Sequence, residues 1–229
     1  MHFDPRVAHH EIDNGGKVIY PFGPPIYQNY ISDDLHKKLL DSGRAIRDEH
    51  HSHDDQLAGN MYFGGSYHYE ASVIEDAKPE LFGYLLDWLE FMYNAYGKKR
   101  VTFVPGSDSF DLKLSTMWVN FQKRYDFNPV HHHGGIVSFV LFLQVPKKIF
   151  EVQANSNAQT AGQLSFQHGE AMSPLCPTGW SVKPSSKLIL MFPATLNHFV
   201  PSFWADEERI SVSGNFHVTG GSAPSLTGI

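Results

Sequence analysis

Three adjacent histidines, His131, His132 and His133, stand in the middle of this 229-residue chain. Imidazole is a common ligand of transition metals. In a β-strand, residues two apart project from the same face, so His131 and His133 can reach one ion while His132 points away. A third ligand must come from another strand, and His198 is the best candidate because it follows the apolar segment LILMFP. Three ligands on one side of an ion leave the other side open, as oxygen chemistry requires, but their spacing does not choose between iron, zinc, copper and nickel.

Arg209 follows His198 by eleven residues and begins the alternating segment RISVSGNFHV. Its planar guanidinium matches a carboxylate through two parallel hydrogen bonds, and Ser211, on the same face of a strand, can add another. An inward-facing arginine is costly unless it is paired. A permanent acidic partner or a bound dicarboxylate would each satisfy this requirement. Alternatively, Arg209 is exposed at the start of the strand and pairs with Glu207 or Glu208.

Two helices are predicted in the first half of the chain. Ser32 is a suitable N-cap for a helix that extends to about residue 48, and acidic residues follow it in the first turn. Pro79 is typical of the first turn of a second helix, which apolar residues at helical spacing continue to Gly97. Between the two helices, residues 50–70 show no periodicity and predict a long loop. Such loops often serve as lids or substrate-binding walls.

From about residue 110 the pattern changes to short strands separated by turn residues, which indicates a sandwich or jelly roll. We expect one domain over residues 1–229, with helical support at about 30–100, a β core at about 110–218 and a mobile tail at 219–229. The first 16 residues read as irregular. The predicted strands cover residues 18–22, 114–122, 136–145, 150–152, 163–166, 187–192 and 209–218.

Composition narrows the classes of protein further. A net charge of -6 argues against a nucleic acid as the main partner, because phosphate binding needs a basic surface. The one cysteine, Cys176, excludes an intrachain disulfide. No apolar stretch is long enough to span a membrane and the first residues lack a signal-peptide core, so we expect a cytoplasmic protein. A second histidine cluster, His50, His51 and His53, reads as a solvated loop.

The combined pattern of His131-x-His133, the distal His198 and Arg209-x-Ser211 resembles the iron(II)/2-oxoglutarate-dependent oxygenases. These carry His-x-Asp/Glu, a distal His and Arg-x-Ser on a double-stranded β-helix. The segments NPVHHHGGIVSFVLFLQVP, LILMFPATLNHFVP and EERISVSGNF are similar to small oxygenases of bacteria and marine phages, as are PFGPPIY and DDQLAGN. The resemblance covers about residues 18–218.

This resemblance implies a mainly β protein with flanking helices, built on a double-stranded β-helix (jelly-roll, cupin-like). It implies that iron(II) and the co-substrate 2-oxoglutarate bind in one site. By position in the motifs, the iron ligands would be His131, His133 and His198. The distal carboxylate of 2-oxoglutarate would be held by Arg209 and Ser211, with a further hydrogen bond to the co-substrate from Asn120 in STMWVNFQ.

His133 departs from the commoner family pattern, which has an aspartate or a glutamate at this position. Three interpretations follow. His133 binds the metal in a three-histidine site, which we favour. A carboxylate such as Asp126 or Glu170 completes the site instead. Or His133 lies outside the ligand set and leaves a coordination position free.

The reaction implied is hydroxylation of a C–H bond by dioxygen, with release of succinate and carbon dioxide from 2-oxoglutarate. The substrate would be a prolyl or other side chain of a protein, or a small metabolite. One alternative is a three-histidine, cupin-type dioxygenase that does not use 2-oxoglutarate and has no need of Arg209. A second alternative is a non-catalytic jelly-roll module with a binding or structural role.

Overall fold

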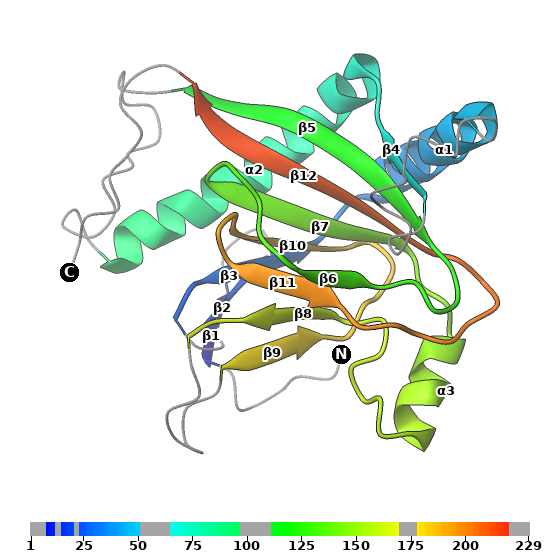
Figure 1. Ribbon diagram of the computed structural model, residues 1–229. Helices are drawn as coiled ribbons and strands as arrows, with labels where there is room; N and C mark the ends of the chain where they lie inside the picture. The colour runs from blue at the N-terminus through cyan, green and yellow to red at the C-terminus, as the bar shows by residue number, and fades with distance from the viewer. Residues whose placement is uncertain are drawn as a thin grey trace.

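Two antiparallel sheets form the body of the protein, and α-helices lie outside them (Figure 1). The computed structural model describes residues 8–11, 15–20, 23–50, 65–96, 111–169 and 178–219. The larger sheet has the strand order β1-β2-β3-β10-β7-β12-β5-β4, and the smaller has the order β6-β11-β8-β9. Two stacked antiparallel sheets are the architecture of a jelly roll.

The strands of the larger sheet are β1 (Ala8–Glu11), β2 (Lys17–Tyr20), β3 (Ile26–Tyr30), β4 (Gly65–His68), β5 (Asp111–Gln122), β7 (Val137–Gln144), β10 (Leu188–Pro193) and β12 (Arg209–Thr219). Those of the smaller sheet are β6 (Asn128–His131), β8 (Leu164–Gln167), β9 (Gly179–Val182) and β11 (Asn197–Val200). The helices are α1 (Asp33–His50), α2 (Ala71–Tyr96) and α3 (Lys148–Asn155).

The central strands of the larger sheet are apolar on both faces because each face is covered by a different layer. On β7, Phe139 and Leu141 belong to the cluster that packs against α1 and α2, whereas Val140 and Phe142 belong to the cluster between the two sheets. Side chains alternate along a strand, so a strand covered on both faces reads as an unbroken apolar run. The cavity described below lies on the inter-sheet face of this layer.

Helix α1 begins as predicted, with the Ser32 hydroxyl accepting a hydrogen bond from the Leu35 amide at 3.2 Å. The predicted start of α2 is wrong, because the helix begins at Ala71 and Pro79 lies inside it. An internal proline costs about 3 kcal/mol. The face formed by Ala77, Leu81 and Leu85 is fully buried, and its packing offsets that cost.

The predicted strands are confirmed except for the shortest, at residues 150–152, and several further short strands were not predicted. Residues 150–152 lie in α3 rather than in a strand, since an apolar run this short has no period that distinguishes helix from strand. Strand β1 lies within the first 16 residues, which were expected to be irregular, and β4 lies near the end of residues 50–70, which were expected to be a loop. The remaining unpredicted strands are β3, β6, β9 and β11.

Several predicted features lie outside the described residues. They are the greater part of the 50–70 loop with His51 and His53, the thiol of Cys176, the carboxylate of Glu170 and nearly all of the C-terminal tail. Among the helices that are described, none is both long and apolar enough to cross a membrane.

Candidate metal centre

His131 and His198 meet because their strands pair. His131 ends β6, His198 lies in β11, and the two residues are direct partners across the antiparallel ladder. Their ring centroids are 4.3 Å apart. His198 is buried, with Phe192 packed against its ring at 4.8 Å. The strand pairing therefore places two imidazoles side by side at the inner face of the smaller sheet.

His133 joins this pair, but not from the strand on which the sequence placed it. Strand β6 ends at His131, and a turn with Gly135 at φ +97° follows. The His133 amide donates a hydrogen bond to the Ala194 carbonyl at 2.9 Å, which holds the segment against the turn before β11. The His133 ring lies 5.0 Å from each of the other two rings. One candidate ligand atom from each of His131, His133 and His198 lies within 4.8 Å of the others.

Backbone carbonyls set the tautomers of two of these histidines. His131 Nδ1 lies 2.7 Å from the Pro129 carbonyl oxygen, and His198 Nδ1 lies 2.9 Å from the Leu196 carbonyl oxygen. A carbonyl oxygen can only accept, so Nδ1 carries the hydrogen on both rings. Each Nε2 then keeps its lone pair for a metal, an arrangement typical of metal-binding histidines.

Burial also keeps two of the imidazoles, those of His133 and His198, neutral. Burial lowers the pKa of His198 to about 3, and the nearby His131 contributes to the shift. Burial lowers the pKa of His133 to about 4, with contributions from His131 and His132. Metal binding requires the deprotonated ring, so these rings are ready to bind a cation at neutral pH.

Arg209 is the largest fully buried side chain of the described residues, and its guanidinium has no acidic partner among them. Its Nε donates to the Gly162 carbonyl at 3.1 Å, and its Nη1 donates to Gln122 Oε1 and to Ser211 Oγ, the latter at 3.3 Å. Its Nη2 has no hydrogen-bond partner. Burial lowers the pKa of Arg209 to about 9, which still leaves the group charged at pH 7.

The alternative of an exposed Arg209 paired with a neighbouring glutamate is therefore wrong. Glu208 forms its ion pair with Arg47 at 2.7 Å, and Glu207 is exposed. Arg209 is buried and lines the cavity, whereas the two glutamates that precede it do not line it. The buried cation consequently remains without a compensating anion among the described residues.

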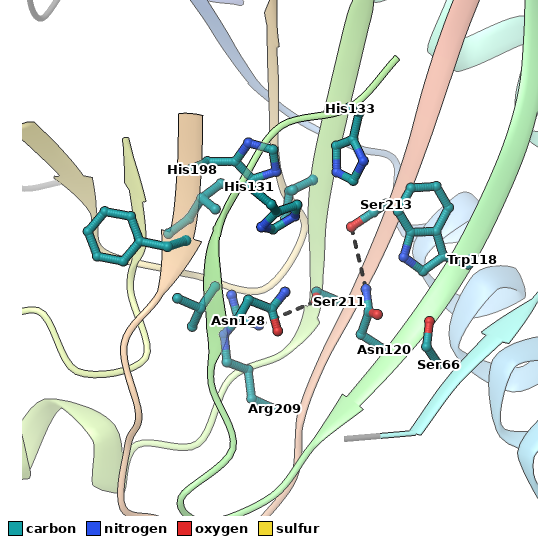
Figure 2. A pocket seen from close by; sticks show the side chains of 14 residues that line it. Ser66, Trp118, Asn120, Asn128, His131, His133, His198, Arg209, Ser211 and Ser213 are labelled. Atoms are coloured by element: carbon teal, nitrogen blue, oxygen red, sulfur yellow. Dashed lines mark hydrogen bonds between the residues drawn. The ribbon is translucent and has the colours of Figure 1, made fainter. Parts of the chain in front are cut away.

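One cavity of about 270 Å³ connects the histidines to Arg209. Figure 2 shows the three imidazoles gathered at one end and Arg209 at the other, with Ser211 and Asn128 between them. The described residues that line the cavity include no carboxylate. They are Ser66, Trp118, Asn120, Asn128, His131, His133, Val140, Leu164, His198, Phe199, Val200, Arg209, Ser211 and Ser213.

Asn120 lines the cavity, where its Nδ2 donates to Ser213 Oγ at 3.4 Å. Asp126, in contrast, lies in the turn after β5, where its carboxylate accepts the Lys123 amide at 2.6 Å. It is not part of the ligand cluster. Among the described residues, His133 is thus the third group placed beside His131 and His198.

The sequence prediction assigned no role to four polar residues of this site, Gln122, Asn128, Ser66 and Ser213. Gln122 contacts Arg209 and also donates to Asn128 Oδ1 at 2.9 Å. A signal for Gln122 was available, because Trp118, Asn120 and Gln122 alternate along one strand and therefore share a face. Asn128 carried no such signal, since its place follows from the pairing of β6 with β11.

The donor sets fit the two groups expected here. Three imidazoles on one side of a cavity suit a divalent transition metal with open coordination positions. A buried guanidinium with a free Nη2 suits a carboxylate. A jelly roll with these two features at the ends of one cavity is therefore suited to binding a divalent metal and a carboxylate together.

Residues 116–215 match the family model described as "Putative 2OG-Fe(II) oxygenase". This range contains every cavity-lining residue except Ser66. The resemblance predicted from the sequence is confirmed, and with it the expected cofactors, iron(II) and 2-oxoglutarate. Residues 116–215 are therefore similar to an oxygenase core of the 2OG-Fe(II) type. No curated protein sequence matches the chain.

Solved structures confirm the double-stranded β-helix fold. A prolyl-4-hydroxylase from Pseudomonas putida aligns with a TM-score of 0.52 at 16% identity, over 84% of this chain and 92% of that one. AviO1 from Streptomyces viridochromogenes Tue57 aligns with a TM-score of 0.52 at 10% identity, over 87% and 90% of the two chains. The non-heme alpha ketoglutarate dependent epimerase SnoN from nogalamycin biosynthesis aligns with a TM-score of 0.50 at 13% identity, over 88% and 83%.

Proposed function

We propose that the chain is an iron(II)- and 2-oxoglutarate-dependent dioxygenase that hydroxylates its substrate and releases succinate and carbon dioxide. His131, His133 and His198 would bind the metal, and Arg209, Ser211 and Asn120 would hold 2-oxoglutarate. One observation carries the proposal: an arginine with a free Nη2 and no acidic partner among the described residues lines the same cavity as the three histidines. Leaving a buried charge uncompensated costs several kcal/mol, and a bound carboxylate would remove that cost.

Iron(II) and 2-oxoglutarate, when bound, supply the oxidising chemistry that inserts one oxygen atom of dioxygen into a C–H bond. The protein's part is to orient the reactants and keep water away. Arg209 binds the distal carboxylate, which fixes the direction in which the co-substrate lies along the cavity. Trp118 packs edge-on against His133 at 5.6 Å and covers that side of the site.

The two alternatives account for fewer of these features. A three-histidine dioxygenase that does not use 2-oxoglutarate would bear the cost of burying Arg209 without a use for it. A non-catalytic module has no need of two histidines whose Nδ1 hydrogens are held by backbone carbonyls. Both groups of residues gain a role when a metal and a dicarboxylate bind together.

Anaerobic titration tests the proposal. Apoprotein receives iron(II) and then 2-oxoglutarate, and we expect a weak visible charge-transfer band that is absent in Arg209→Ala. Admission of dioxygen should then yield succinate. A folded, iron-loaded protein that shows neither the band nor succinate would refute the assignment.

For the substrate, we propose a prolyl or other side chain of a protein. The support is an analogy with the Pseudomonas putida prolyl-4-hydroxylase, whose fold is similar. The test is mass spectrometry of proline-containing peptides after incubation with enzyme, iron(II), 2-oxoglutarate and dioxygen. The expected product is one oxygen atom heavier, and its formation should stop in His198→Ala. If free amino acids or other metabolites gain the oxygen instead, the peptide proposal is wrong.

A further inference from the structure

Gln122 is a buried amide that contacts Arg209 directly. It ends β5 and is the register partner of Arg209 on β12, and its side chain is 1% exposed. An arginine can only donate, so the oxygen of the amide must face it. Gln122 Oε1 accepts from Arg209 Nη1, and Gln122 Nε2 donates to Asn128 Oδ1 at 2.9 Å. Both ends of the amide are thus fixed.

The acceptors around Arg209 account for one edge of the guanidinium and leave the other free. The group has five N–H bonds, one on Nε and two on each terminal nitrogen. Gly162 takes the one on Nε, and Gln122 and Ser211 take those on Nη1. Both N–H bonds of Nη2 remain without a partner. All three acceptors are neutral, so they orient the guanidinium without compensating its charge.

We propose that Gln122 is a positioning residue whose neutral amide orients Arg209 and preserves its positive charge for the ligand. The inference rests on the proposed function, since it takes 2-oxoglutarate as that ligand. A glutamate at position 122 would have nearly the same shape, but its carboxylate would form a permanent buried ion pair with Arg209. The protein would then satisfy internally the charge that otherwise binds the co-substrate.

The matched variants are Gln122→Glu, Gln122→Met and Gln144→Glu. Gln122→Met keeps the approximate volume and removes the acceptor without adding charge. Gln144→Glu is the control, because Gln144 also accepts from an arginine, Arg44 at 2.9 Å, but does not line the cavity. Each variant is loaded with Mn(II) without dioxygen, and its affinity for 2-oxoglutarate is measured by calorimetry. The melting temperature is measured separately without metal or co-substrate.

We expect Gln122→Glu to weaken 2-oxoglutarate binding by about 10- to 100-fold, the effect of losing a hydrogen bond to a charged group. It should raise the melting temperature of the ligand-free protein, because a buried charge gains a partner. Gln122→Met should weaken binding less and lower the melting temperature, and Gln144→Glu should leave binding within about twofold.

In Gln122→Glu, a lower affinity for 2-oxoglutarate together with a higher melting temperature separates a positioning role from simple damage, since a disrupted site would lose both affinity and stability. If the wild type binds 2-oxoglutarate and Gln122→Glu binds it with the same affinity, the proposed role of Gln122 is overturned and the proposed function is not. An equal loss in Gln122→Met and Gln122→Glu would also overturn that role, since neutrality would then be irrelevant. Failure of the metal-loaded wild type to bind 2-oxoglutarate would refute the proposed function itself.

Discussion

Replacing Arg209 by methionine should separate the stability of the protein from its binding of the co-substrate. Burial lowers the pKa of Arg209 to about 9, and this lowering corresponds to a cost of about 5 kcal/mol for keeping the buried guanidinium charged. The substitution removes this cost. It also removes hydrogen bonds from the charged guanidinium to Gly162, Gln122 and Ser211, which together contribute roughly 5–9 kcal/mol. The free energy of unfolding without ligand should therefore fall by no more than about 4 kcal/mol from wild type.

Binding should respond very differently to the same substitution. A co-substrate present at 100 times its Kd stabilises the folded protein by about 2.7 kcal/mol. For a chain of this size, that raises the melting temperature by roughly 5–10 °C. Losing the charged anchor should weaken binding by more than about 100-fold, so the shift should disappear in Arg209→Met.

The assay is thermal unfolding of Mn(II)-loaded protein without dioxygen, with and without 2-oxoglutarate. Arg44→Met serves as the control, because Arg44 is exposed and donates to Gln144 outside the cavity. A full ligand-induced shift in Arg209→Met would refute the role of Arg209. Loss of more than about 5 kcal/mol of stability in the ligand-free variant would show that the guanidinium charge is already compensated.

Three further predictions concern the metal ligands, pH and packing. His133→Ala should weaken metal binding by more than about 100-fold, which is the largest loss expected for a residue that only supports a ligand, whereas His133→Asp should retain metal binding. Competition with a chromogenic chelator measures both affinities. Near-normal affinity in His133→Ala would exclude this histidine as a ligand. The metal-free protein should lose stability as the pH falls. A histidine in the unfolded chain takes up a proton near pH 6.5, whereas the native pKa of His198 is about 3. This residue alone should therefore lower the free energy of unfolding by about 2–3 kcal/mol between pH 6.5 and 4.5. Urea titrations at both pH values check this, and His198→Asn, which cannot titrate, should show a smaller loss. Gly214→Ala should destabilise the fold by about 1–3 kcal/mol, because the added methyl would lie 2.6 Å from the Phe139 ring; an unchanged urea midpoint would contradict that packing.

The sequence predicted the long, regular elements and the chemistry of the site. Alternating and unbroken apolar runs identify β5, β7, β10 and β12, because a buried strand face needs a period of two. The start of α1 follows from its N-cap. The start of α2 and the nature of α3 could not be read in the same way. Pro79 is a good first-turn residue but is also tolerated inside a well-packed helix, and residues 150–152 are too few to show a period.

The residue types alone determined which groups could bind a metal and a carboxylate: imidazoles at His131, His133 and His198, and a guanidinium at Arg209. The tertiary structure decided how they meet. Strand pairing places His198 opposite His131, and a turn rather than a strand brings His133 to them. Burial turns Arg209 from an ordinary surface cation into one without a compensating anion among the described residues, with Gln122 beside it. Local sequence fixes what each side chain can do, whereas distance and burial depend on contacts between segments far apart in the chain.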